Sequence, residues 1–493
     1  MRKAIFLFAL MAFFADLQAK VVYIATDGSD SSAGTIDAPL ATLPAAYHQI
    51  ASGDTICIRG GRYAITDEQV MKIDHTYAFV FALEKGGSAD RRTCIMGYPG
   101  ERPLFDFSAL QLDGRHRFSA FYLGADYLHL RNFDIVGVPV RMKGHTQSEC
   151  VSARKGSHCI VENIAMHDGM AIGYYQTAGS DNLVLNCDAY NNYDDYSEGV
   201  YGGNVDGFGI HVQKTSETGN AIRYCRAWRN SDDGFDLINN LAPAEFDHCW
   251  AFYNGYRPAA DAHDTTAFLS AGDGNGFKAG GYGMNAGTTK CPAECPQNYI
   301  HHCVAYRNKA NGLYANHHMG GCRWEYNASW QNRSNYNMVN RKSNEEAVDV
   351  PGYGHILKHN VSFTFTDTSK GGHLVNCDAD RCTIENNTFA PAETAVAVSA
   401  SMFVSTDPAT LFAPRDAEGN LPEMVFMRAK QGSILSERQM GWAFEGSSET
   451  AIPLLAAHDL HDAAVYNLNG IQVNPRALHK GLYIKQGKKF VVK

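Results

Sequence analysis

YCRAW (224–228), HCWAF (248–252) and HCVAY (302–306) are three copies of one short pattern. In the same register, the pattern recurs as RNFDI (131–135), ENIAM (162–166), NCDAY (186–190), YNASW (326–330), HNVSF (359–363) and ENNTF (385–389). The second position is Asn or Cys, and the fifth is large and apolar. Successive copies lie 31, 24, 38, 24, 54, 24, 33 and 26 residues apart. A recurring minimum near 24 with insertions of variable length is typical of a solenoid.

The solenoid predicted from this repeat is an all-β fold, the right-handed parallel β-helix. Short apolar stretches such as NLVLNC (182–187) and CTIENN (382–387) alternate between inward and outward positions. One coil cannot bury its apolar face alone, so successive coils stack. Asn at a coil corner can hydrogen-bond to the next coil in an amide ladder. Four cysteines of the repeat are interpreted as small buried residues of the stack rather than disulfide partners: Cys187, Cys225, Cys249 and Cys303.

The N-terminal region carries an export signal and then a cap for the solenoid. Residues 1–19 have a basic start, an apolar run and a small residue at Ala19, which predicts a signal peptide. We therefore expect an exported protein, located in the periplasm, on the outer surface or in the medium. Thr42 and Pro44 predict the N-cap and first turn of a short helix that covers the open end of the coils.

The C-terminal region changes character. The β-helix domain is expected to span residues 20–445, with residues 412–430 lying extended along it. Residues 446–493 are predicted to form a small β module with hairpins around Asn469–Gly470 and Gln486–Gly487. This tail resembles the C-terminal hairpin modules common on exported proteins of the Bacteroidetes, which implies an origin in that group.

Composition excludes some partners. The net charge of −9 gives no electrostatic reason to expect nucleic acid. After the signal peptide, no apolar run reaches the length of a transmembrane segment.

The thirteen cysteines are an odd number, and among them Cys291 and Cys295 are predicted to form a local disulfide. A zinc site that joins these cysteines to His301, His302 and Cys303 is the less favoured alternative.

Four aspartates mark a predicted metal site. NVDGFGIH (204–211) carries Asp206, and NSDDGFDLI (230–238) carries Asp232, Asp233 and Asp236. The two D-G-F elements lie about one coil apart, so the β-helix places them side by side. Converging carboxylates repel each other unless a cation with many oxygen ligands is bound, and Ca²⁺ fits this better than Mg²⁺. A solvated acidic turn is the alternative interpretation.

One repeat later, AGDGNGFKAGG (271–281) places Lys278 among glycines. A lysine in so bare a backbone can be approached by a large ligand. A cation nearby would lower its pKa, and a neutral lysine is a competent general base. An ordinary surface lysine is the alternative.

Together the motifs NVDGFGIHV, CRAWRNSDDGFDLI, GDGNGFKAGG and HHCVAYRNKANGL resemble the family 9 polysaccharide lyases, pectate-lyase-like β-helix enzymes, over about residues 20–445. The resemblance implies Ca²⁺ bound by the four aspartates, Lys278 as the catalytic base, and β-elimination in the uronic-acid backbone of pectin. The substrate would be pectate, or rhamnogalacturonan at the same site. The long segment at 257–273 departs from the family pattern.

Further expectations concern binding and mechanism. Arg307, Tyr314 and Arg333 are candidate substrate-binding residues, and a neutral lysine base implies an alkaline optimum. We expect a monomer whose partner is an acidic plant polysaccharide. A glycoside hydrolase would need two carboxylates flanking the bond, whereas Asp232 and Asp233 are crowded together. A non-catalytic binding or adhesion protein is the other rival.

Overall fold

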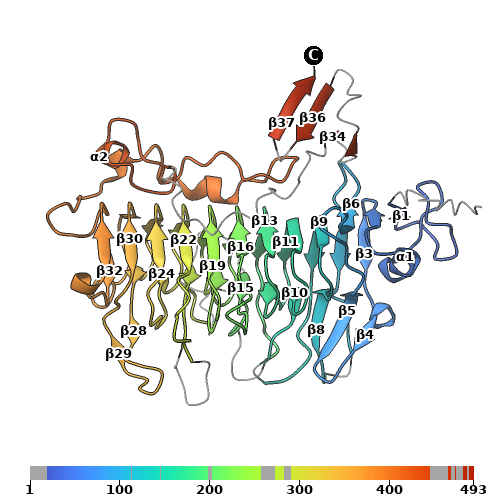
Figure 1. Ribbon diagram of the computed structural model, residues 1–493, viewed down its shortest axis with the longest axis horizontal. Coiled ribbons are helices and arrows are strands. Elements are labelled where there is room, and N and C mark those ends of the chain that lie inside the picture. Colours follow the sequence, from blue (N-terminus) through green and yellow to red (C-terminus); the bar gives the residue numbers. More distant parts are fainter. Residues whose placement is uncertain are drawn as a thin grey trace, which may run out of the picture.

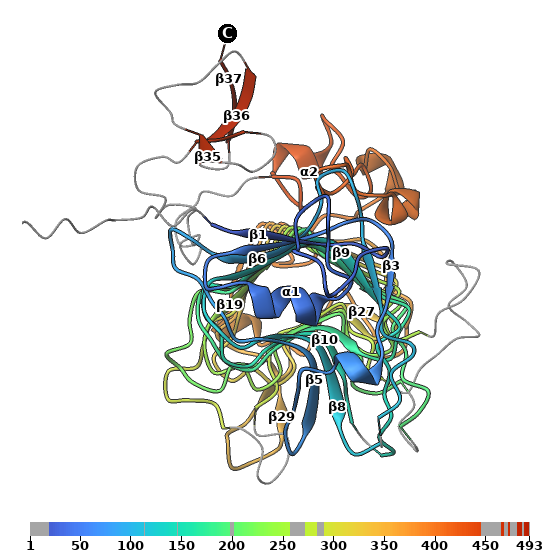
Figure 2. The same cartoon turned by 90° about the vertical axis from the view of Figure 1, so that its right-hand side faces the viewer.

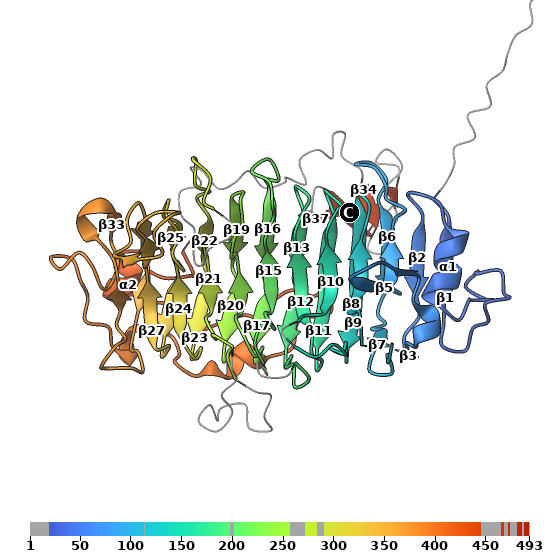
Figure 3. The same cartoon turned by 90° about the horizontal axis from the view of Figure 1, so that it is seen from below.

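The computed structural model describes residues 19–112, 114–144, 146–197, 202–256, 272–282 and 290–444, together with the backbone of four strands near the C-terminus. The strands stack along one long axis, as Figures 1 and 3 show. Within the described part of the chain, no helix is long and apolar enough to cross a membrane.

Three stacks of parallel strands form the walls of the coil. Stack 1 comprises β1 (Val21–Ile24), β2 (Thr55–Ile58), β6 (Thr93–Gly97), the first parts of β9 (Leu128–Val136) and β11 (Ile160–His167), β13 (Leu183–Leu185), β16 (Asn220–Arg223), β19 (Ala244–Asp247), β22 (Tyr299–His301), β25 (Arg323–Glu325), β30 (Ile356–Lys358) and β33 (Thr383–Glu385). Stack 2 comprises β3 (Arg62–Ala64), β7 (Leu104–Asp106), the second parts of β9 and β11, β14 (Asp188–Tyr190), β17 (Arg226–Trp228), β20 (Trp250–Phe252), β23 (Val304–Tyr306), β26 (Ala328–Trp330) and β31 (Val361–Ser362).

Stack 3 is the wall on which the candidate site lies. It comprises β4 (Lys72–Ile73), β5 (Tyr77–Leu83), β8 (Arg117–Leu123), β10 (Glu149–Ala153), β12 (Ile172–Gln176), β15 (Phe208–Ile210), β18 (Phe235–Asp236), β21 (Phe277–Lys278), β24 (Asn311–Tyr314), β27 (Ser334–Asn337) and β32 (Leu374–Val375). Every pairing in it is parallel except β4 with β5. The predicted parallel β-helix is therefore confirmed.

The remaining elements are short. They are α1 (Leu43–Gln49), α2 (Ile434–Glu437), the antiparallel pair β28 (Asn340–Arg341) and β29 (Asp349–Val350), and 3-10 turns at Asp67–Gln69, Ala379–Arg381, Ala400–Met402 and Pro408–Phe412. The end-on view in Figure 2 shows α1 across the mouth of the coil. Its N-cap is Thr42, whose hydroxyl accepts a hydrogen bond from Ala45 N at 3.3 Å, and Leu43, Ala46 and Tyr47 are buried. This confirms the predicted cap.

The corner between stacks 1 and 2 corrects the register of the repeat. Nine side chains occupy its inner position: Phe133, Ile164, Cys187, Cys225, Cys249, Cys303, Asn327, Asn360 and Asn387. The predicted register of RNFDI, ENIAM and ENNTF is therefore wrong by one residue. In these copies Asn132, Asn163 and Asn386 hold the left-handed corner itself, with φ of 68°, 49° and 51°. Asn tolerates the left-handed conformation at the corner and forms the amide ladder at the inner position, so it occurs at both.

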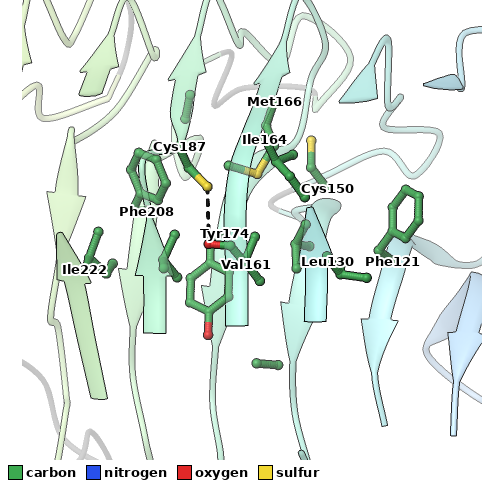
Figure 4. Close-up of a cluster of buried hydrophobic side chains, with 14 of the residues drawn as sticks. Phe121, Leu130, Cys150, Val161, Ile164, Met166, Tyr174, Cys187, Phe208 and Ile222 are labelled. Atoms are coloured by element: carbon green, nitrogen blue, oxygen red, sulfur yellow. Dashed lines mark hydrogen bonds between the residues drawn. The ribbon is translucent and has the colours of Figure 1, made fainter. Parts of the chain in front are cut away.

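The cysteines of the inner row are free thiols, as predicted. Burial raises the pKa of Cys187, Cys225 and Cys249 well above the ordinary value of a thiol. Figure 4 shows Cys187 among apolar neighbours, where its thiol donates to Val161 O at 3.5 Å. Cys291 and Cys295 form the predicted disulfide.

Two amide ladders cross the coils. The predicted ladder joins Asn327, Asn360 and Asn387, with Nδ2 to Oδ1 distances of 3.0 and 2.8 Å. The sequence analysis missed a second ladder between stacks 2 and 3: Asn192, Asn230, Asn254, Asn308 and Asn332. Each member is the seventh residue counted from the first residue of the corner pattern, so a longer repeat window would have found it.

The segment at 412–430 packs along stack 2, as predicted. Arg415 Nη2 lies 2.7 Å from Asp188 Oδ1, and Arg226 Nη1 donates to Ala413 O at 2.7 Å. Despite burial, the two arginines hold the pKa of Asp188 well below its usual range. Phe412 and Phe426 pack on the aromatic side chains of stack 2. A buried ion pair and apolar contact therefore fix this segment to the coils.

The C-terminal tail contains the strands that the sequence predicted. β34 (Val465–Asn467) pairs antiparallel with β35 (Gln472–Val473) and β36 (Gly481–Lys485), and β36 pairs with β37 (Lys488–Val492). The turn residues of both hairpins, the boundary near residue 446 and residues 1–18 of the predicted signal peptide lie outside the described residues.

Candidate active site

Stack 3 brings the aspartates and the lysine together by register. Phe208, Phe235 and Phe277 stack inside the coil, with ring centroids 5.1 and 4.9 Å apart. On the outward face, Gly209, Asp236, Lys278 and Tyr314 follow one another in successive coils. The repeated Phe thus aligns the strands so that Lys278 lies between Asp236 and Tyr314.

A row of acidic and amide side chains precedes the Phe row. Asp206 Oδ1 accepts from Asp233 N at 3.0 Å, Asp233 Oδ1 from Asn275 N at 2.6 Å, and Asn275 Oδ1 from Asn311 N at 3.2 Å. We call these four residues the Asx row. Each member ties its own coil to the next, so Asp206 and Asp233 are structural residues as well as site residues.

Glycine separates the Asx row from the Phe row for a steric reason. A Cβ atom at Gly207, Gly234 or Gly276 would lie 3.0, 2.8 or 2.9 Å from the amide nitrogen of a residue in the second ladder. The second ladder therefore requires glycine at these positions. This explains why the motif reads D-G-F, D-G-F and N-G-F in three successive coils.

Lys278 is buried among carboxylates rather than open to approach. Its side chain is 8% exposed, and Nζ lies 2.9 Å from Asp233 Oδ2, 3.3 Å from Asp236 Oδ2 and 3.9 Å from Asp273 Oδ2. The contact with Asp233 is an ion pair without hydrogen-bond geometry, because Asp233 Oδ2 is buried and accepts no hydrogen bond. The Lys278 side chain is therefore much less exposed than the sequence predicted.

The protonation of the site follows from burial and mutual repulsion. Burial and the neighbouring carboxylates raise the pKa of Asp232 to about 7 and that of Asp206 well above its usual value. Burial raises the pKa of Asp236 to about 6, partly offset by Lys278. Burial alone would lower the pKa of Lys278, but Asp233 and Asp236 raise it well above the ordinary value. The protein atoms alone therefore favour the charged lysine, and the predicted lowering of its pKa by a bound cation stays a prediction.

The arrangement fits a hard cation. Asp206, Asp232 and Asp233 each offer an oxygen within 4.8 Å of the others. Asp233 Oδ2 pairs with Lys278 but accepts no hydrogen bond, so a cation could satisfy it further. Asp232 is positioned by Asn204 N and Asp273 N at 2.9 and 2.6 Å. Asp236 lies at the lysine side, where its Oδ1 accepts from Ile238 N at 2.7 Å. An all-oxygen donor set of this kind suits Ca²⁺.

The predicted substrate-binding residues separate into two groups. Tyr314 is the register neighbour of Lys278. Arg307 packs on Tyr253, with its guanidinium carbon 5.9 Å from the ring centroid, in the turn after stack 2. Arg333 is exposed in the loop between β26 and β27. Among the described residues, no ion pair joins Arg307 or Arg333 to the four aspartates.

His211 is a site residue that the sequence analysis missed. Its side chain is 9% exposed, its Nε2 lies 4.0 Å from Asp236 Oδ2, and it packs against Tyr175 with ring centroids 4.8 Å apart. A Cβ atom at Gly209 would lie 2.9 Å from His211 Nε2, so glycine makes room for the imidazole. The signal was present, because His211 lies two residues after Gly209 and therefore shares its strand face.

The chain is similar to known proteins over most of its length. Residues 22–360 match the family described as "Pel9A-like, right handed beta helix region". The chain belongs to this family. Pectate lyase L of Dickeya dadantii (strain 3937) is 31% identical over 418 residues, which cover 84% of this chain and 85% of that protein. Pectate lyase PEL9 of Emericella nidulans is 29% identical over 352 residues, covering 67% and 78%.

Two solved structures are similar to this chain. A rhamnogalacturonan lyase has a TM-score of 0.79 and 39% identity, covering 86% of this chain and 100% of that one. Pectate lyase Pel9A has a TM-score of 0.61 and 28% identity, covering 85% and 91%. The chain is a polysaccharide lyase, and these relatives give no support to a glycoside hydrolase or an adhesion protein.

Proposed function

We propose that this lyase cleaves the galacturonate-containing backbone of pectin by Ca²⁺-dependent β-elimination, with Lys278 as the general base. The observation that carries the proposal is the position of Lys278 Nζ, 2.9 Å from a buried carboxylate oxygen that accepts no hydrogen bond. A base and an incomplete cation site are thus adjacent on one outward face of stack 3.

The aspartates would hold the cation, and the lysine would move the proton. Asp206, Asp232 and Asp233 offer the convergent oxygens, and Asp236 completes the set at the side of Lys278. When bound, Ca²⁺ supplies positive charge that acidifies the proton next to the substrate carboxylate and stabilises the resulting anion. Lys278 Nζ takes the C5 proton, and a C4–C5 double bond forms as the bond from C4 to the glycosidic oxygen breaks. That oxygen leaves with the electron pair and takes up a proton, so the net reaction moves one proton from C5 to oxygen and consumes no water.

Lys278 acts as a base only after its ammonium has lost a proton. Asp233 and Asp236 oppose this loss while their negative charges remain available to the lysine. A cation bound to these carboxylates would therefore lower the pKa of Lys278. Alkaline pH favours the same neutral amine. We propose an alkaline optimum on this ground.

Pectate is the first candidate substrate, since the curated relatives at about 30% identity are named pectate lyases. Rhamnogalacturonan is the second. It is favoured by the higher identity and TM-score of the rhamnogalacturonan lyase, 39% and 0.79, compared with 28% and 0.61 for Pel9A. Tyr314, beside Lys278, would contact the sugar next to the one that loses its proton.

The test is product analysis on polygalacturonate and on rhamnogalacturonan, with Ca²⁺ or with a chelator. We expect unsaturated uronate ends on one of the two polymers, and their loss on chelation. Lys342→Ala is the matched control for Lys278→Ala, because Lys342 is exposed and, within the described residues, its ammonium pairs only with Glu346, 2.7 Å away. Saturated products, or unsaturated products that persist without Ca²⁺, would contradict the proposal.

We further propose export through the predicted signal peptide and action as a monomer. N-terminal sequencing of the mature protein should begin at Lys20, and light scattering should give the mass of one chain. A retained N-terminus or a dimer mass would overturn these two points.

A further inference from the structure

A cluster of one aspartate and three histidines lies at the corner between stacks 1 and 2, whereas Lys278 lies on stack 3. Asp247 ends β19, His248 forms the corner after it, and His301 and His302 occupy the same two positions in the next coil. His301 and His302 are 7% and 8% exposed. The lyase chemistry proposed above uses none of the four.

The nearest ring nitrogens of the three histidines surround Asp247 Oδ1. Asp247 Oδ1 lies 2.5 Å from His248 Nδ1, 3.3 Å from His301 Nδ1 and 3.7 Å from His302 Nδ1. His301 Nδ1 and His302 Nδ1 are 2.7 Å apart, and their rings cross at 77°. Ligand atoms around a tetrahedral Zn²⁺ with bonds of about 2.0–2.1 Å are separated by about 3.3 Å. The observed separations lie on both sides of that value.

The opposite nitrogens of two rings are already committed as donors. His302 Nε2 lies 2.7 Å from Phe444 O, which can only accept, so this nitrogen carries a proton. His301 Nε2 lies 3.0 Å from Glu245 Oε1, and the same carboxylate forms a buried ion pair with Arg223. A neutral imidazole has one proton, so the two Nδ1 atoms present lone pairs to each other. The contact requires a positive charge between them.

This hydrogen-bond pattern is typical of metal-binding histidines. Such ligands donate their distal N–H to a carboxylate or a backbone carbonyl, as His301 does to Glu245 and His302 to Phe444. The fourth group is the Asp247 carboxylate, whose Oδ1 lies 2.5 Å from His248 Nδ1. Neutral nitrogens with one carboxylate suit Zn²⁺, whereas Ca²⁺ prefers oxygen alone.

We propose that Asp247, His248, His301 and His302 bind a Zn²⁺ ion at this corner, separate from the acidic site of the lyase. A single extra proton would relieve only the His301–His302 contact, whereas a metal ion would engage all four groups. Because His302 also holds Phe444 O, the ion would attach the end of the segment after stack 2 to the coils.

The corner itself supplies conservative variants. Tyr224, His248, His302, Tyr326 and His359 form one row of stacked rings, with neighbouring centroids 4.5 to 5.2 Å apart. Tyr therefore already occupies this position in two coils, so His248→Tyr and His302→Tyr preserve the stack. His359→Tyr is the matched control, because His359 faces Asn386 and Gln439 O rather than a carboxylate.

The experiment is Zn²⁺ titration of the full chain by calorimetry, after chelation and then saturation with Ca²⁺ to occupy the acidic site. We expect one Zn²⁺ per chain, with at least tenfold weaker binding in His248→Tyr and His302→Tyr and unchanged binding in His359→Tyr. Co²⁺ should give the visible absorption of a tetrahedral nitrogen and oxygen site in the parent protein only.

Two results would overturn the proposal: no stoichiometric Zn²⁺ binding, or equal binding in all four proteins. In the first case, nitrogen NMR that finds both protons on His301 would assign the charge to an imidazolium. The readout does not depend on lyase activity. Failure here therefore leaves the proposed function standing, and loss of β-elimination leaves the zinc site standing.

Discussion

The second amide ladder and the Asx row are both stacks of polar side chains along the axis, and they differ at two rungs. In the ladder every amide has its partners; Asn254, for example, donates to Asn308 Oδ1 and Ala227 O and accepts from Asn230. In the Asx row two rungs are carboxylates, which only accept, and Asp233 Oδ2 is left without a hydrogen bond. An amide stack is self-sufficient, whereas the acidic rungs require positive charge from outside the row. Lys278 supplies part of that charge.

The largest expected effect comes from removing this lysine. Lys278→Ala should lower kcat by roughly 10²- to 10⁴-fold, the usual contribution of a general base. Lys278→Arg should not restore activity, because a guanidinium keeps its proton. Initial rates of formation of unsaturated product measure the effect, and Lys342→Ala should leave them unchanged. A near-normal kcat in Lys278→Ala would show that Lys278 is not the general base.

Placing a carboxylate in the amide ladder should be the next most costly change. In Asn254→Asp, oxygens would face Ala227 O and Asn308 Oδ1, which now receive hydrogen bonds at 3.0 Å. We expect a loss of about 2–4 kcal/mol in the free energy of unfolding, measured by urea denaturation. A change below about 1 kcal/mol would mean that the two stacks tolerate charge equally.

The converse change makes an acidic rung neutral. Asp233→Asn should keep the hydrogen bond from Asn275 N but lose one carboxylate at the cation site. We expect kcat/KM to fall by about 10- to 100-fold at fixed Ca²⁺, with weaker Ca²⁺ binding by calorimetry and little change in stability. Asp380→Asn, at an exposed position, is the control. Full activity in Asp233→Asn would show that the row needs no charge there.

The smallest effect is a dependence of stability on pH that Ca²⁺ should remove. The raised pKa values of Asp232 and Asp236, about 7 and 6, favour their neutral forms in the folded chain without metal. Their stabilising contribution is full below about pH 4 and is lost as pH rises through 6 and 7. The Tm difference between Ca²⁺-loaded and chelated protein should therefore widen by several degrees from pH 4 to 7. A constant difference would argue against cation binding at these carboxylates.

Much of the site could be predicted because a solenoid converts sequence spacing into spatial neighbours. The repeated D-G-F element predicted Asp206 beside Asp233, and GNGFK predicted Lys278 in the next coil. Spacing does not give side-chain direction, so the burial of Lys278 and the position of His211 over Gly209 were not foreseen. Asn serves both at a left-handed corner and in a ladder, and for this reason three copies of the repeat were shifted by one residue.

The inner row of free cysteines has a consequence for how the folding of the chain can be followed. Cys187, Cys225, Cys249 and Cys303 lie in four successive coils, and each thiol becomes buried only when the coils on either side have closed over it. Their rates of protection against an alkylating reagent would therefore time the closure of individual coils. Four equal rates would indicate cooperative assembly, and a graded series would give the direction in which the helix winds.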